Sequence, residues 1–68
     1  MGVTDEPFHV ELDGRDCGRG VIRESDCGWA FGWERPDGIV THGGPFDSPE
    51  TAGERLMDCV TGWYASLQ

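Results

Sequence analysis

The chain lacks lysine: its five basic residues are all arginine, and they stand against thirteen aspartate and glutamate residues. The formal net charge is therefore -8 at pH 7 in a chain of 68 residues. Contacts of lysine and arginine with phosphates supply much of the affinity of nucleic-acid-binding proteins, so direct nucleic-acid binding is disfavoured. Such an acidic excess either keeps a small protein soluble or complements a positively charged surface.

Long apolar runs are also missing. No stretch approaches the roughly 18 apolar residues of a membrane-spanning helix. The amino terminus has neither the positive charge nor the apolar core of a signal peptide, and an acidic protein is repelled by anionic lipid headgroups. We therefore expect a cytoplasmic protein that does not contact membranes.

The cysteines are too few and too widely spaced for a disulfide framework or a zinc site. Cys17, Cys27 and Cys59 cannot all pair within one chain, and no Cys-x2-Cys pair is present. His9 and His42 do not supply the missing paired spacing. We expect reduced thiols, no bound metal and no cofactor.

Signatures of catalysis are absent as well. The sequence has no Gly-x-Ser-x-Gly elbow and no phosphate-binding glycine loop. Serine, histidine and aspartate could be combined into a triad only by chance, because acidic residues are so numerous. A domain of this size has little room for a pocket that would separate the pKa values of two carboxyl groups. We predict that the protein is not an enzyme and has no catalytic residues.

The first half of the chain predicts two strands. Residues 8–12 alternate apolar and polar side chains, as a half-buried strand does. Asp13-Gly14 opens a turn, and the glycine- and charge-rich stretch that follows, as far as Gly20, predicts a loop. A short second strand is expected over residues 21–24.

A third strand, over residues 29–34, places Trp29, Phe31 and Trp33 on one face. Proline and glycine in residues 35–38 predict a tight turn, and a fourth strand follows over residues 39–42. The sequence Gly-Gly-Pro at residues 43–45 is expected to end that strand.

The last third of the chain predicts a helix. Ser48 suits the position before the first turn, Pro49 suits the first helical position, and Glu50 favours the positive end of the helix dipole. Apolar residues then recur at helical spacing to about Leu67, and Cys59 is expected among them. The predicted fold class is α+β: an antiparallel sheet (meander) of three or four strands with one carboxy-terminal helix packed on one face, in the order ββββα. Residues 1–68 are expected to form a single small domain whose first six residues are flexible.

The aromatic residues of the third strand allow two interpretations. Exposed aromatic side chains on a sheet can stack on the bases of single-stranded nucleic acid, but such surfaces lie in positively charged grooves. The charge here is negative, so we expect Trp29, Phe31 and Trp33 to pack in the core beneath the helix.

The acidic residues include a regular series on the predicted helix. Glu50, Glu54 and Asp58 are four residues apart, with Asp47 just before the first turn and Glu34 on the third strand. Carboxylates at this spacing lie on one side of a helix and repel each other mildly. A row of fixed carboxylates approximates the phosphates of a nucleic acid, so these five residues are the predicted partner-binding residues.

Two resemblances follow from these features. The two tryptophans of the third strand, the Pro36-Asp37-Gly38 turn and the Phe46-x-Ser48-Pro49-Glu50-x-Ala52 helix entry resemble small DNA-binding domains of the AP2 and integrase amino-terminal type. Those domains read DNA with a basic sheet, which this composition does not provide. In size, acidity and sheet-plus-helix pattern, the chain also resembles phage-encoded inhibitors of host defence, including anti-CRISPR proteins that act as DNA mimics.

The second resemblance implies an acidic, non-enzymatic inhibitor. It would occupy the basic, DNA-binding channel of a nucleoprotein complex, most specifically a CRISPR surveillance complex. The alternative is a small docking or homodimerising domain of phage or bacterial origin, whose acidic residues serve only solubility. We expect a monomer or a weak homodimer. A homodimer would form through the edge of the fourth strand or through an exposed Trp63-Tyr64 pair.

Overall fold

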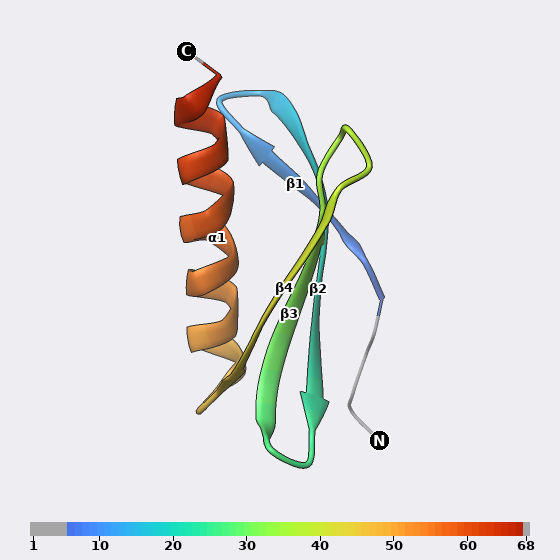
Figure 1. The fold of residues 1–68 in the computed structure, drawn as a ribbon, viewed down its shortest axis with the longest axis vertical. Helices are drawn as coiled ribbons and strands as arrows, with labels where there is room; N and C mark the ends of the chain where they lie inside the picture. The colour runs from blue at the N-terminus through green and yellow to red at the C-terminus, as the bar shows by residue number, and fades with distance from the viewer. Residues whose placement is uncertain (1–5, 68) are drawn as a thin grey trace.

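The computed structural model describes residues 6–67, which form an antiparallel sheet and one helix (Figure 1). The strands lie side by side in the order β1-β2-β3-β4, and the helix follows them in the chain. The elements are β1 (Phe8–Leu12), β2 (Arg15–Ser25), β3 (Gly28–Glu34), β4 (Val40–Phe46) and α1 (Pro49–Ser66). The predicted α+β fold with a meander and a carboxy-terminal helix is confirmed. The expected flexibility of the first six residues falls mostly on residues 1–5, which lie outside the described part.

The first hairpin is tighter than the sequence indicated. Asp13 and Gly14 both have positive φ, at 53° and 77°, as in a two-residue type I′ turn. Pairing therefore resumes at once, with Leu12 opposite Arg15, and β2 runs from Arg15 onward. The predicted loop as far as Gly20 is wrong because an Asp-Gly turn needs no further residues to reverse the chain.

A glycine inside β2 explains why that stretch looked irregular. Gly18 has φ +95°, and the pairing of β1 with β2 shifts register between His9 and Glu11 beside it. A Cβ atom at Gly18 would lie 2.0 Å from the carbonyl oxygen of Glu34. The glycine thus permits a bulge and a close approach of β3, and it does not mark a loop.

The turn between β3 and β4 forms as predicted, but β4 is longer than expected. The amide of Gly38 donates to the Arg35 carbonyl at 2.9 Å, which closes the turn. β4 then continues to Phe46, so the expectation that residues 43–45 end the strand is wrong. A Cβ at Gly43 would lie 2.5 Å from the Phe31 ring, so this glycine makes room for an aromatic side chain within the strand.

Helix α1 begins as predicted. The Ser48 hydroxyl accepts a hydrogen bond from the Thr51 amide at 3.1 Å, and Pro49 occupies the first turn, where no amide donor is needed. The helix ends at Ser66, with Leu67 as its carboxy-terminal cap.

The core lies between α1 and one face of the sheet (Figure 1). Trp33 packs edge-on against Trp63 of the helix with ring centroids 5.8 Å apart. The aromatic core is confirmed for Phe31 and Trp33, whereas Trp29 is half-buried. The buried apolar residues are Val10, Cys17, Phe31, Trp33, Ala52, Leu56 and Val60.

The cysteines do not lie where the helix pattern placed them. Cys59 is exposed, so its predicted position in the apolar stripe is wrong, while Cys17 on β2 is completely buried. The helix contacts the sheet along the line Ala52, Leu56 and Val60, at intervals of four residues, and Cys59 lies off that line. In residues 6–67, no helix has both the length and the hydropathy needed to cross a membrane.

Candidate partner-binding site

The outer side of α1 carries a row of carboxylates, Glu50, Glu54 and Asp58, which we call the acidic stripe. All three residues are exposed. At 1.5 Å rise per residue they follow one another at intervals of about 6 Å. The acidic stripe is offset by two residues, or about 200° of helix rotation, from the buried line of Ala52, Leu56 and Val60. It therefore points away from the sheet.

The support beneath the acidic stripe is well packed. Ala52 and Val60 have no exposed surface, and Leu56 is 1% exposed. Ser48 caps the amino-terminal end of the same helix. Because the helix is packed along its whole buried side, the Cα atoms of the three acidic residues keep fixed spacings.

Little positive charge lies near the acidic stripe. Arg55 approaches Asp58 at 3.9 Å, between two exposed side chains, and an exposed pair of this kind contributes little stability. Glu50 and Glu54 have no ion pair with any of residues 6–67. The last turn of α1 carries no basic residue.

Of the two other predicted partner-binding residues, Asp47 lies just before the start of the acidic stripe and Glu34 lies apart from it. Asp47 is exposed in the connection between β4 and α1, immediately before the Ser48 cap. Glu34 is exposed at the end of β3, opposite Arg19 of β2 and Val40 of β4. Glu34 and Arg19 belong to the sheet face that α1 does not cover, so Glu34 cannot share a flat binding surface with the acidic stripe.

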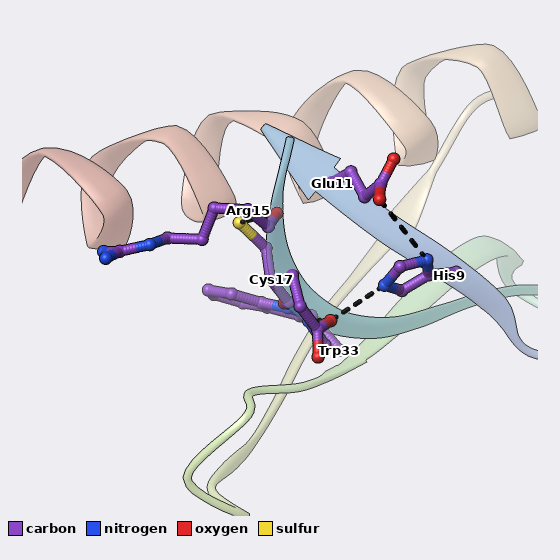
Figure 2. A network of polar contacts seen from close by, with 7 residues as sticks. His9, Glu11, Arg15, Cys17 and Trp33 are labelled. Carbon is purple, nitrogen blue, oxygen red and sulfur yellow. Dashed lines mark hydrogen bonds and ion pairs between the residues drawn. The ribbon is translucent and has the colours of Figure 1, made fainter. Parts of the chain in front are cut away.

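Two acidic residues of the first hairpin are engaged in hydrogen bonds and ion pairs. The His9 ring lies between Asp16 and Glu11, with its Nε2 atom 2.9 Å from Asp16 Oδ1 and its Nδ1 atom 4.0 Å from Glu11 Oε2. Figure 2 shows the His9 ring beside Glu11. The same Asp16 oxygen accepts from the amide of Gly18 at 2.9 Å. These hydrogen bonds, first that of Gly18 and then that of His9, lower the pKa of Asp16. Asp16 thus supports the bulge and is not a free carboxylate of a binding surface.

Asp37 is similarly engaged in hydrogen bonds, in the turn between β3 and β4. Its carboxylate accepts from the Arg35 guanidinium and from the Ile39 amide, and these two bonds lower its pKa. The turn prediction identified Asp37 only as turn material. The spacing of two residues between Arg35 and Asp37 is the feature of the sequence from which this ion pair could have been predicted.

Arginines cover the two aromatic residues proposed as a dimer contact. Arg35 lies over the Trp63 ring at 5.8 Å, and Arg15 lies over the Tyr64 ring at the same distance. Trp63 and Tyr64 are both half-buried and pack against the core. Neither ring is fully exposed, contrary to what the homodimer alternative expected, because Arg15 at the start of β2 and Arg35 in the turn after β3 reach across to the helix.

The described residues bring together no obvious set of catalytic groups. Among residues 6–67, no three histidine, cysteine, aspartate or glutamate side chains gather so that they could hold a metal ion. The hollow beside the first hairpin includes His9, Asp16, Arg19 and Glu34, all of them exposed. We find there no buried nucleophile with an adjacent base.

The chain matches no protein-family model, no curated protein and no solved structure. A functional assignment therefore depends on the arrangement of charged and apolar side chains described above.

Proposed function

We propose that this protein is a non-enzymatic binding protein whose acidic stripe occupies a basic, nucleic-acid-binding surface of a partner protein. The observation that carries the proposal is the regular exposure of Glu50, Glu54 and Asp58 on one side of a firmly anchored helix. The helix spaces these residues about 6 Å apart along its axis, and their carboxylates would meet lysine or arginine side chains that ordinarily contact phosphates.

The cost of the acidic stripe supports a role beyond solubility. Like charges four residues apart destabilise a helix by a few tenths of a kcal/mol per pair, and here they occur twice in succession. The net charge of -8 is at the upper end of the magnitude, about 2 to 8, that suffices for solubility of a small domain. A complementary surface would convert this repulsion into binding energy and fast association.

The specific partner that we propose is a CRISPR surveillance complex, with the protein acting as a phage-encoded anti-CRISPR DNA mimic in the bacterial cytoplasm. Small size, acidity and a compact sheet-plus-helix fold support this specific form. In it, Glu50, Glu54 and Asp58 are the main contact residues, and the exposed Asp47 extends the same acidic surface beyond the start of α1.

The test uses purified CRISPR surveillance complexes and their target duplex DNA. The wild-type protein should reduce DNA binding by a susceptible complex, and its own affinity should fall steeply as salt rises. Replacing Glu50, Glu54 and Asp58 together by glutamine removes three charges and relieves repulsion along the helix. Affinity should fall by about tenfold or more, mainly through faster dissociation, because charge pairs buried at an interface govern the dissociation rate.

A matched control separates the acidic stripe from net charge. Replacing Glu6 and Glu24 by glutamine and Asp26 by asparagine also removes three exposed charges, but none from α1. This control should inhibit as wild type does. If the two triple variants lose inhibition equally, bulk charge and not the acidic stripe is responsible. If no complex is inhibited by the wild type, the CRISPR-specific form of the proposal is wrong.

A further inference from the structure

The sheet has a second face, which α1 does not cover (Figure 1). A Cβ at Gly20 would lie 2.7 Å from Leu56, so Gly20 faces the helix. Side chains alternate along a strand, and its neighbours Arg19 and Val21 therefore face the other way, as does Arg23. Gly32 of β3 lies opposite both Val21 and His42 of β4. We call the surface formed by Arg19, Val21, Arg23, Gly32, Val40 and His42 the open face; the carboxylate residue Glu34 lies on the same side of the sheet, at the end of this surface opposite Arg19.

The open face has an apolar centre. A Cβ at Gly32 would lie 3.2 Å from Val21 and 3.5 Å from the His42 ring, so these two side chains flank a position with no side chain of its own. The six residues line one shallow hollow. At its edge Val40 is 53% exposed, which is high for a β-branched residue in a strand.

Two arginines of the open face have no partner among residues 6–67. Arg15 and Arg35 lie over aromatic rings of α1, Arg35 also binds Asp37, and Arg55 approaches Asp58. Arg19 and Arg23 take part in no ion pair and lie over no ring in the described part of the chain. Arg19 even lies directly opposite Glu34 in the sheet without pairing with it. In a chain with thirteen acidic residues, this leaves two guanidinium groups beside an apolar hollow.

The outer side of α1 carries the complementary features. Met57 is 36% exposed and lies three residues after Glu54, so it is next to Glu54 on the helix surface, at the Asp58 end of the acidic stripe. Glu50 and Asp58 are about 12 Å apart along the helix axis. Arg19 and Arg23 are about 13 Å apart along an extended strand. The two end carboxylates of the acidic stripe are thus spaced as the two guanidinium groups of the open face are, and Met57 supplies apolar surface beside Asp58.

We infer that the open face binds the outer side of α1 of a second copy of this chain. With the helix laid along β2, Glu50 and Asp58 reach Arg19 and Arg23, and Met57 adds apolar contact at the end of the hollow where Asp58 binds. The two surfaces lie on opposite sides of the molecule, so the contact is head-to-tail, and in a dimer one copy keeps a free acidic stripe and the other a free open face. Self-association through this contact covers the acidic stripe and would therefore regulate the proposed function. This regulatory role rests on the proposed function, whereas the contact between copies does not.

Net charge sets the conditions under which the contact forms. Two copies with a charge of -8 each repel one another at low salt, and about 0.15 M salt screens this long-range repulsion. The short ion pairs of the contact are weakened only at higher salt, about 1 M. We expect association to be strongest at intermediate salt and weaker at both extremes. This non-monotonic dependence differs from the monotonic fall expected for binding to a basic partner.

Sedimentation equilibrium of two complementary variants tests the contact. One variant carries Arg19→Gln and Arg23→Gln, and the other carries Glu50→Gln, Glu54→Gln and Asp58→Gln. At about 0.15 M salt the wild type should show a mass that rises with concentration. Each variant alone should remain monomeric. An equimolar mixture should form a one-to-one dimer and nothing larger, because the intact acidic stripe of the first variant meets the intact open face of the second.

Other results would overturn the inference. They are a monomeric wild type at millimolar concentration, a mixture that stays monomeric, or variants that still dimerise alone. The last result would show a symmetric contact, such as pairing of two β4 edges. An Arg15→Gln variant is the control, since it removes an arginine without altering the open face or the acidic stripe, and it should associate as wild type does. The Arg19, Arg23 variant keeps the acidic stripe, so its inhibition of a surveillance complex tests the proposed function separately.

Discussion

The indole Nε1 of Trp33 donates a hydrogen bond of 2.7 Å to the main-chain carbonyl of Cys17, within the core. Figure 2 shows the two residues side by side beneath the first hairpin. The bond joins β3 to β2 next to the Gly18 bulge, where the regular pairing of β1 with β2 is interrupted. A single side chain therefore both fills the core and holds the irregular part of the sheet.

Changing Trp33 should separate these two roles. Trp33 is 3% exposed, so Trp33→Ala should lower the free energy of unfolding by about 3 to 5 kcal/mol, enough to unfold a domain of low stability. Trp33→Phe retains a ring but leaves the Cys17 carbonyl without its indole donor, which should cost about 1 to 3 kcal/mol from that bond. Urea denaturation followed by circular dichroism measures both. A folded Trp33→Ala variant with wild-type stability would show that this side chain is not core.

Gly18 should tolerate no side chain. Gly18→Ala places a Cβ 2.0 Å from the Glu34 carbonyl oxygen and imposes a φ of +95° on a residue with a side chain, so it should destabilise the protein by several kcal/mol. Gly14→Ala is the control, because its φ is also positive, at 77°, but nothing lies within 4 Å of its Cβ. It should cost about 1 to 2 kcal/mol. Equal losses of stability in the two variants would contradict the close approach of β3 to Gly18.

Stability should depend on the ionisation of Asp16 in acid. Hydrogen bonds from Gly18 and His9 hold the folded-state pKa of Asp16 below its unfolded value, so the stabilising effect is present above about pH 4 and is lost as the pH falls through the lower, folded pKa. Asp16→Asn removes this dependence. Between about pH 4 and pH 2 the wild type should therefore lose stability faster than Asp16→Asn does. Parallel pH profiles of the two proteins in thermal unfolding would contradict this assignment.

The three thiols should differ in reactivity. Cys17 is completely buried, whereas Cys27 and Cys59 are exposed. A thiol-specific chromogenic reagent should label Cys27 and Cys59 rapidly in the native protein and Cys17 only on unfolding. Cys59→Ser should leave stability nearly unchanged, in contrast to Cys17→Ser, which places a hydroxyl in the core. Rapid labelling of Cys17 in the native state would mean that the first hairpin opens readily.

Local chemistry in the sequence predicted most of the elements correctly. Alternation identified β1 and β3, proline and glycine identified the turn after β3, and Ser48-Pro49-Glu50 identified the start of α1. Each of these signals acts through residues close to one another in the chain, by capping an amide or by fixing a dihedral angle. The choice of Glu50, Glu54 and Asp58 as one surface was possible for the same reason, since helical geometry alone places them on one side.

What the sequence by itself determined, then, is the ββββα order, the turns, the helix cap and the regular row of carboxylates. Only the tertiary structure decided the roles of Gly18 and Gly43, because these depend on the Glu34 carbonyl and the Phe31 ring of a neighbouring strand. It also decided that Cys17 and not Cys59 is buried, and that Glu34 lies away from the acidic stripe. The pairing of Arg15 and Arg35 with aromatic rings of α1 was likewise invisible in the sequence. In each case the deciding neighbour is remote in the chain, and packing alone brings it within van der Waals distance.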